Sequence, residues 1–176
     1  MRMKKATQMP AVRRTATLGL LCALAVALSF LEGWLPVLPV PGAKLGLSNI
    51  VTMYTLSVMG LPAALSVSVV KGLFALLRGG TACLMSLSGA LLSTLIMAAV
   101  LPLYKRMLSF VGIGIAGAVG HNTAQLGVAM LLMDSSLVYY APWLLLMALL
   151  AGLLTGMVLN VVMPALGRLT GKMRCK

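Results

Sequence analysis

The amino-acid sequence predicts an all-α integral membrane protein with six transmembrane helices and both termini in the cytoplasm. Hydrophobic residues make up 61% of the 176 residues. A water-soluble protein of this length could not bury so many apolar side chains in its core. Charged residues account for 9%, whereas a typical soluble domain has about 25%. The apolar residues also fall into six stretches of nearly the length that a helix needs to cross a bilayer.

The six expected spans are separated by short connections, and together they form one transmembrane domain over 15–164 between basic segments at 1–14 and 165–176. The spans cover 15–31, 45–59, 62–77, 83–101, 110–133 and 139–162. The first span resembles a signal peptide because it follows basic residues. No small-residue cleavage site follows it, so we expect a retained span.

Prolines and glycines mark the ends of these spans. Three prolines and a glycine within 36–42 prevent a helix between the first two spans. Gly60-Leu61-Pro62 and Arg78-Gly79-Gly80 predict tight turns before and after the third span. The fourth and sixth spans are expected to end near Pro102 and Pro164.

The basic residues predict the orientation, because Lys and Arg gather on the cytoplasmic side of membrane proteins. Five lie in the N-terminal segment, two in the connection at 105–106 and four in the C-terminal tail, which makes eleven of the 14. The two acidic residues, Glu32 and Asp134, fall on the opposite side. We therefore expect a multi-pass protein of the inner (plasma) membrane. The basic residues left over are Lys44, Lys71 and Arg78.

Several classes of function are disfavoured by the composition. Aromatic residues are only 5% and the basic residues sit at span ends, so nucleic acid is not an expected partner. The two acids are 102 positions apart and cannot form a carboxylate cluster for metal-bound diphosphate. The three cysteines form no C-x-x-C pair. We expect no metal, no cofactor and no catalytic residues in this chain.

Two cations in the third span are the first candidates for a binding site. Lys71 lies about ten residues into the span, where a charge costs roughly 2.5–3.5 kcal/mol on insertion scales. Arg78 follows seven residues later, so both share one helix face and suit an anionic group. The alternative is that both side chains extend to the outer interface and have only a structural role.

A polar group in the fifth span is the second candidate. His121, Asn122 and Gln125 lie within about one helical turn at mid-membrane, where buried amides and an imidazole need partners. They are candidates for substrate binding. The alternative is a hydrogen-bonded clamp between helices, with Asn49 or Ser88 as the partner.

Lys44 and Asn49 extend the first candidate. If the second span begins near Gly46 or Ser48, its amide groups point outward, and helix N-termini favour anions. Lys44, Asn49, Lys71 and Arg78 are then expected to line one outward-facing, cation-rich pocket. Glu32 would balance one cation or bind a cationic part of the ligand.

Small residues recur at every fourth position in three spans, a spacing that lets helix backbones approach closely. Packing inside the bundle and docking to another membrane subunit both remain open from the spacing alone. The three stripes are Gly19-Ala23-Ala27, Gly112-Ala116-Gly120 and Ala148-Gly152-Gly156.

The segments 23–32, 41–50, 78–80 and 121–126 together resemble a known family. Segment 23–32 and the proline-rich loop after it are similar to the first helix of the substrate-binding S components of energy-coupling-factor transporters. Segment 41–50 (PGAKLGLSNI), the Arg-Gly-Gly turn and the sequence HNTAQL are similar to the Gx transporter family, also called heptaprenyl diphosphate synthase component I. The resemblance covers about 16–162 and implies an S-component-like bundle with an outward-facing pocket. It also implies that Ala23 and Ala27 face a transmembrane coupling subunit driven by separate ATPases.

We therefore expect a membrane-embedded subunit that binds a small anionic or zwitterionic solute for a transporter. It is not expected to be an enzyme itself. The chain has no G-x-x-x-x-G-K-[ST] loop, so ATP hydrolysis would belong to a partner. The competing prediction is a membrane partner of heptaprenyl diphosphate synthase in isoprenoid or quinone biosynthesis, with a prenyl diphosphate as ligand. A third is a structural membrane protein whose polar residues only join helices.

Overall fold

The computed structural model describes residues 10–34, 46–104, 107–133 and 135–169, and these residues form six α-helices with three short 3₁₀ segments. The expected number of helices is therefore confirmed. In chain order the elements are α1 (Ala11–Trp34), α2 (Leu47–Met59), α3 (Leu61–Phe74), η1 (Ala75–Arg78), α4 (Gly80–Val100), η2 (Leu101–Leu103), α5 (Phe110–Leu132), η3 (Ser135–Tyr140) and α6 (Ala141–Leu169).

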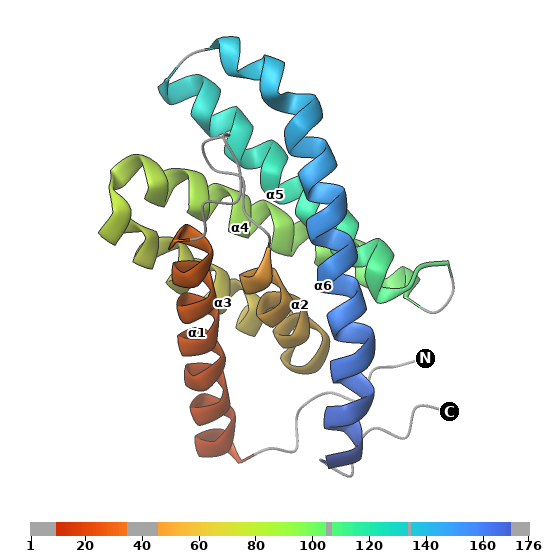
Figure 1. The fold of residues 1–176 in the computed structure, drawn as a ribbon. Helices are drawn as coiled ribbons and strands as arrows, with labels where there is room; N and C mark the ends of the chain where they lie inside the picture. The colour runs from red at the N-terminus through yellow and green to blue at the C-terminus, as the bar shows by residue number, and fades with distance from the viewer. Residues whose placement is uncertain (1–9, 35–45, 105–106, 134, 170–176) are drawn as a thin grey trace.

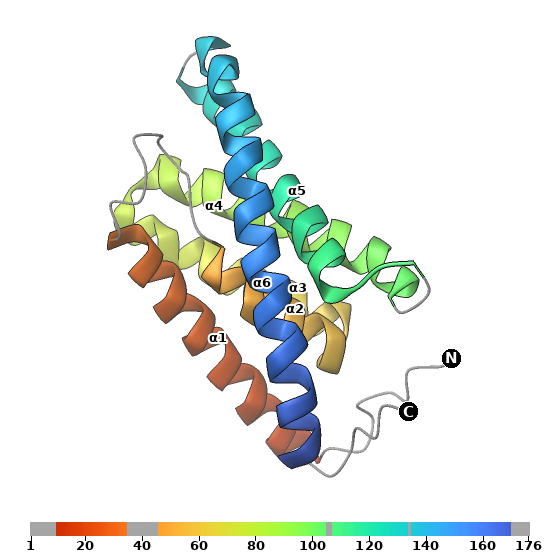
Figure 2. The same cartoon turned by 45° about the vertical axis from the view of Figure 1, so that its right-hand side comes forward.

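The short helix α2 is the centre of the bundle and contacts each of the five other α-helices. α5 and α6 pack side by side as an antiparallel pair, and their joined ends project beyond the rest of the molecule (Figure 1). The start of α1 and the end of α6 lie at the same end of the bundle in both views (Figures 1 and 2). This arrangement is the one that an even number of membrane crossings requires.

Four stretches of the described chain are helical, apolar and long enough to cross a membrane. They are Ala11–Gly33, Leu61–Arg78, Gly80–Leu103 and Ser136–Ala165. The two other helices differ for separate reasons. α2 has 13 residues and is only about 20 Å long at 1.5 Å per residue, whereas α5 has 23 residues but carries the polar residues His121, Asn122 and Gln125. α2 contacts each of the other α-helices, so protein replaces lipid as its surroundings. α5 packs mainly between α4 and α6 and keeps an exposed side that includes Thr123 and Leu131.

Several helix ends differ from the sequence-based expectation. α1 is longer at both ends than the expected 15–31, and α3 ends at Phe74, where a 3₁₀ turn replaces its last residues. α6 continues through Pro164 to Leu169, although a helix end was expected there. Proline removes one backbone donor but is tolerated in membrane helices, where neighbouring groups can satisfy the freed carbonyl. α4 begins at Gly80, three residues earlier than expected, directly after Gly79 at φ 120°. A positive φ of this kind is readily adopted by glycine and ends η1 sharply.

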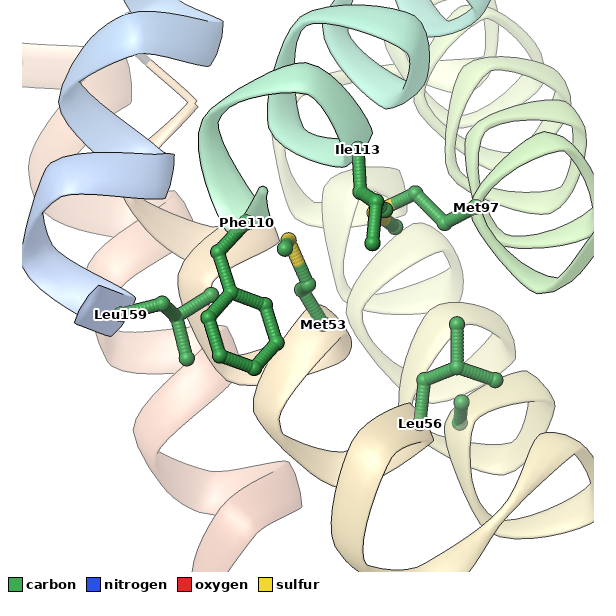
Figure 3. Packing of buried hydrophobic residues seen from close by; sticks show 7 residues of the cluster. Met53, Leu56, Met97, Phe110, Ile113 and Leu159 are labelled. Atoms are coloured by element: carbon green, nitrogen blue, oxygen red, sulfur yellow. The ribbon is translucent and has the colours of Figure 1, made fainter. Parts of the chain in front are cut away.

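The main hydrophobic core joins α2 to the helices around it (Figure 3). Met53 and Leu56 of α2 point toward side chains from α4, α5 and α6 in this view. The fully or almost fully buried members of this core are Met53, Leu56, Ala64, Met97, Phe110, Ile113 and Leu159. The flexible methionine side chains fill the irregular space that remains between helices of different direction.

The small-residue stripes have different roles. Ala148 is fully buried, and Gly152 and Gly156 let the backbone of α6 touch the backbone of α5. A Cβ atom on Gly152 would stand 2.6 Å from the backbone nitrogen of Ile115, and one on Gly156 would stand 2.6 Å from that of Val111. The α6 stripe is therefore a packing surface.

The stripes of α5 and α1 do not match that role. α5 meets α6 through the Gly114 and Ala118 face and not through Gly112, Ala116 and Gly120. Gly120 instead makes room for Ile96 of α4. On α1 a Cβ atom at Gly19 would meet nothing within 4 Å, and Ala23 and Ala27 are exposed. The α1 stripe thus stays on the outside of this chain.

Candidate functional site

The N-terminus of α2 lies between α1 and α6 and is held by an acidic side chain. The Glu32 carboxylate accepts a hydrogen bond from the backbone N–H of Leu47 through Oε1, and one from the Ser48 hydroxyl through Oε2 at 3.3 Å. Gly46 adopts φ 75° directly before the helix, a conformation that glycine reaches without strain. Its carbonyl oxygen accepts a hydrogen bond from Thr155 of α6 at 3.4 Å.

Glu32 therefore supplies the negative charge that the N-terminus of a helix favours. The sequence-based hypothesis was that this helix end binds an external anion and that Glu32 balances a cation or binds a cationic part of the ligand. The structure corrects the first point, because the carboxylate of the chain itself occupies the first turn of α2. The balancing of a cation by Glu32 stays a prediction. Glu32 is only 5% exposed.

One turn further along α2, a buried ammonium group completes the network. Lys71 of α3 is 3% exposed, and its Nζ donates hydrogen bonds to Asn49 Oδ1 at 2.8 Å and to Thr52 Oγ1 at 3.2 Å. The structure thus brings together Asn49 and Lys71, two of the predicted site residues. A cation at this depth is expensive unless it is well hydrogen-bonded, and such residues in membrane spans usually mark a pathway or a ligand site.

A pocket opens beside Lys71 between α1 and α3. It is shallow and partly open to the outside, and the space enclosed within it has room for about one water molecule. Lys71 and Arg78 both contribute to its walls, which agrees with their predicted position on one helix face. The lining residues are Val26, Ser29 and Phe30 from α1, with Lys71, Phe74, Ala75 and Arg78 from α3 and η1.

Arg78 crosses from η1 to the last turn of α1. A Cβ atom at Gly33 would stand 3.3 Å from Cζ of Arg78. The absence of a side chain at Gly33 therefore leaves room for the guanidinium group. Cations are favourable near helix C-termini, where the last carbonyl groups have no partner within the helix. Arg78 is exposed, and it adds a second positive charge at the outer part of the pocket.

The polar residues of α5 lie against α4 and α6, and they are not in the lining of this pocket. His121 and Gln125 face Gly89 of α4, where a Cβ atom would stand 2.9 Å from Cε1 of His121 and 3.0 Å from Cγ of Gln125. Gly89, His121 and Gln125 are buried. Ser93, which lies on the same face of α4 as Gly89, is buried as well. The α4–α5 interface is therefore polar and depends on glycine for its close approach.

Asn122 forms the interhelical clamp that was one of the two interpretations of this motif, but with a different partner. Its Nδ2 donates a hydrogen bond of 2.9 Å to the backbone carbonyl of Leu144 in α6. The expected partners are engaged elsewhere, since Asn49 binds Lys71 and the Ser88 hydroxyl donates to the Met85 carbonyl at 3.1 Å. The expectation of a clamp with Asn49 or Ser88 is therefore wrong.

We expect Asn122→Ala to lower the free energy of unfolding by about 1 kcal/mol, since membrane hydrogen bonds of this kind contribute about 0.6–1.7 kcal/mol. The measurement is the midpoint of unfolding in mixed detergent micelles. Thr123→Ala is the matched control, because that exposed hydroxyl only returns to the Val119 carbonyl in its own helix. An equal effect of both substitutions would contradict the clamp.

Lys44, the remaining predicted site residue, lies outside the described residues. Sequence reasoning missed Ser29 and the two phenylalanines, Phe30 and Phe74, that line the pocket. Helical spacing offered a signal for two of them. Ser29 lies three residues before Glu32 on α1, and Phe74 lies three residues after Lys71 on α3. Positions three residues apart share a helix face.

Within the described ranges, no group of three or more His, Cys, Asp or Glu side chains could hold a metal ion. The donors gathered at the pocket are an ammonium, a guanidinium and a hydroxyl, and these bind anions rather than cations. Chemically, the arrangement can neutralise and orient a negatively charged group between α1 and α3.

Comparison with known proteins gives one family. The family model described as heptaprenyl diphosphate synthase component I matches residues 21–162, which include all six helices in whole or in part. No curated protein and no solved structure matches the chain. The matched range contains Glu32, Asn49, Lys71, Arg78 and the polar group of α5. The chain therefore belongs to the heptaprenyl diphosphate synthase component I family, which is also known as the Gx transporter family.

Proposed function

We propose that this chain is the membrane-embedded substrate-binding subunit of a transporter for a small anionic or zwitterionic solute. The observation that carries the proposal is Lys71, an ammonium group 3% exposed inside an apolar helix and bound to Asn49 and Thr52. Arg78 shares the pocket beside it. A bundle that needed only stability would be served as well by an apolar residue at position 71.

In this proposal all six helices cross the inner membrane and both termini are cytoplasmic. The positions of the start of α1 and the end of α6 at one end of the bundle support it (Figure 1), as does the gathering of eleven basic residues in segments of that side. The solute enters from the opposite side, where α2 begins and where η1 ends with Arg78.

Translocation is assigned to partner subunits, as in the S components of energy-coupling-factor transporters. The exposed stripe of Ala23 and Ala27, with the open space at Gly19, supports a docking surface for a transmembrane coupling subunit. Helices without side-chain bulk can approach closely in lipid. ATP would be hydrolysed by separate ATPases, and this chain has no catalytic role of its own.

A second function is favoured by the family description. The chain would then be the membrane component that accompanies heptaprenyl diphosphate synthase, and its cationic pocket would hold a prenyl diphosphate. Co-purification separates the two functions. Mild extraction of the full chain should bring an ATPase and a coupling subunit with it under the transport proposal, and a soluble prenyl synthase under the second.

Lys71→Met tests the binding site itself. We expect retention of a water-soluble ligand, followed by native mass spectrometry, to fall at least about tenfold, because a buried charge contact between protein and ligand is worth at least about 1.4 kcal/mol. Methionine keeps most of the side-chain volume, and the unfolding midpoint reports whether the variant is folded.

Ser57→Ala is the control, since that hydroxyl lies on α2 and only returns to the Met53 carbonyl. A folded Lys71→Met protein that retains or transports the solute as well as the Ser57→Ala protein would refute the proposed site.

A further inference from the structure

The pocket between α1 and α3 has a polar floor and an apolar rim. Ser29 and Lys71 are 6% and 3% exposed and form its inner part. Phe30 and Phe74 are about half exposed and stand at its opening. Floor and rim come from the two helices that flank the gap, so a molecule bound here touches charge at one end and hydrocarbon at the other.

Ser29 is the hydroxyl of the pocket that makes no hydrogen bond to another described residue. Several other hydroxyls in the helices return to their own helix, as Thr55 and Thr94 do by donating to the carbonyl four residues earlier at 2.8 Å. Ser48 and Thr155 instead bind another segment of the chain. Among the described residues, Ser29 makes no such bond, although it is more than nine-tenths buried. The Ser29 hydroxyl is not fully enclosed, unlike the unpartnered Ser93 Oγ and Gln125 Oε1 at the α4–α5 interface. Ser29 lines the pocket, so a bound molecule can reach its hydroxyl from there.

The charges at the pocket are positive. Arg78 lies seven residues beyond Lys71, which is about 10 Å along the helix axis. The Arg78 guanidinium has no hydrogen-bond partner within the described ranges. Among the described residues, Glu32 makes no ion pair with Arg78, and its carboxylate faces the first turn of α2. The pocket thus has donors available on α1 and on η1.

The exposed residues around the opening are apolar, as is expected of a surface that faces lipid. Leu73 and Leu77, which flank Phe74 on the same stretch of chain, are 52% and 75% exposed, and the outer face of α1 is equally apolar at Leu24 and Leu31. A molecule reaching the pocket from this side arrives through lipid. Free phosphate from solution has no apolar part that the phenylalanine rim would contact.

We propose that this pocket binds the phosphate head of a membrane lipid. The Arg78 guanidinium donates to two phosphate oxygens, the Ser29 hydroxyl donates to a third or to an ester oxygen, and Lys71 adds charge below them. The apolar chain of the lipid lies against Phe30 and Phe74. The inference requires the chain to be embedded in a bilayer. The lipid would compete with the solute of the transport proposal, because both are placed on Lys71 and Arg78 of one pocket.

The experiment compares three probes on the full chain in mild detergent by native mass spectrometry. Phosphatidic acid carries phosphate and chains, diacylglycerol carries only the chains, and inorganic phosphate carries only the head. We expect one molecule of phosphatidic acid to be retained per chain, with retention at least about tenfold stronger than for either other probe.

Variants locate the site. Arg78→Gln should weaken retention of phosphatidic acid about tenfold or more, and Ser29→Ala about threefold to tenfold, as expected for a charged and a neutral donor. Arg14→Gln is the matched control, because Arg14 is an exposed arginine at the other end of α1. Both Arg78 and Arg14 are exposed, so each substitution should change the unfolding midpoint only slightly.

Three results would overturn the inference. Equal retention of diacylglycerol would show a non-specific lipid coat, and equal retention of inorganic phosphate would show a site for a free anion. Equal weakening by Arg78→Gln and Arg14→Gln would place the lipid elsewhere. Equal retention of inorganic phosphate would overturn this inference and leave the transport proposal standing, so the two proposals fail separately.

Discussion

Glu32→Ala is expected to lower the free energy of unfolding by about 3–5 kcal/mol, the usual cost of removing one partner from a buried charged network. The substitution leaves the N–H of Leu47 and the hydroxyl of Ser48 without their acceptor. It also removes the buried negative charge of Glu32 from the N-terminal part of α2, where Lys71 is a buried cation. The measurement is the unfolding midpoint and its denaturant dependence in mixed micelles.

Glu32→Gln separates the charge from the hydrogen bonds. The amide keeps an acceptor for the first turn of α2, so the expected loss is smaller, about 1.5–3 kcal/mol. Thr15→Ala is the control on the same helix, because that exposed hydroxyl only returns to the Ala11 carbonyl. Near-wild-type stability of Glu32→Ala would mean that the carboxylate does not cap α2.

Combining Glu32→Gln with Lys71→Met should cost less than the sum of the single substitutions. Both charges act on neighbouring residues of α2, Ser48 and Asn49, and removing both leaves no unbalanced buried charge. Strict additivity would show that the two side chains are energetically independent.

The fold was predictable to the level of its helices because hydropathy and turn residues are properties of the chain itself. Gly60 and Gly79 adopt φ of 90° and 120° at the turns where the sequence requires breaks. The central position of α2 was not predictable, since an apolar helix surrounded by protein and one surrounded by lipid have the same composition. Its length of 13 residues was the available signal.

The candidate site was also predictable only in part. Spacing along one helix correctly placed Lys71 and Arg78 on one pocket, and the depth of Lys71 indicated that it needs polar partners. Contacts between helices were less accessible. The role of Glu32 depends on the path of the chain between α1 and α2, and the choice of Leu144 as partner for Asn122 depends on how α6 packs. Backbone carbonyls carry no sequence signal.

Gly156→Ala is expected to destabilise the α5–α6 pair by about 2–3 kcal/mol, at the upper end of the usual cost of overpacking. The added Cβ atom would stand 2.6 Å from the backbone nitrogen of Val111 and 2.8 Å from the carbonyl oxygen of Phe110. Backbone atoms inside a helix cannot move aside as a flexible side chain does. The two helices must therefore separate, and with them the Asn122 clamp and the Leu159 contact with the core.

Gly127→Ala is the control for this prediction, because it is the same substitution on α5, the other helix of the pair. A Cβ atom at Gly127 meets nothing within 4 Å, so only helix propensity changes, and alanine should stabilise the helix by up to about 1 kcal/mol. Helix propensity acts equally at position 156, which means that a loss there must come from contact between backbones. If both alanines stabilised the protein in unfolding measurements, α5 and α6 could not be packed as closely as the structure places them, and the small residues of α6 would be as free for an outside partner as those of α1.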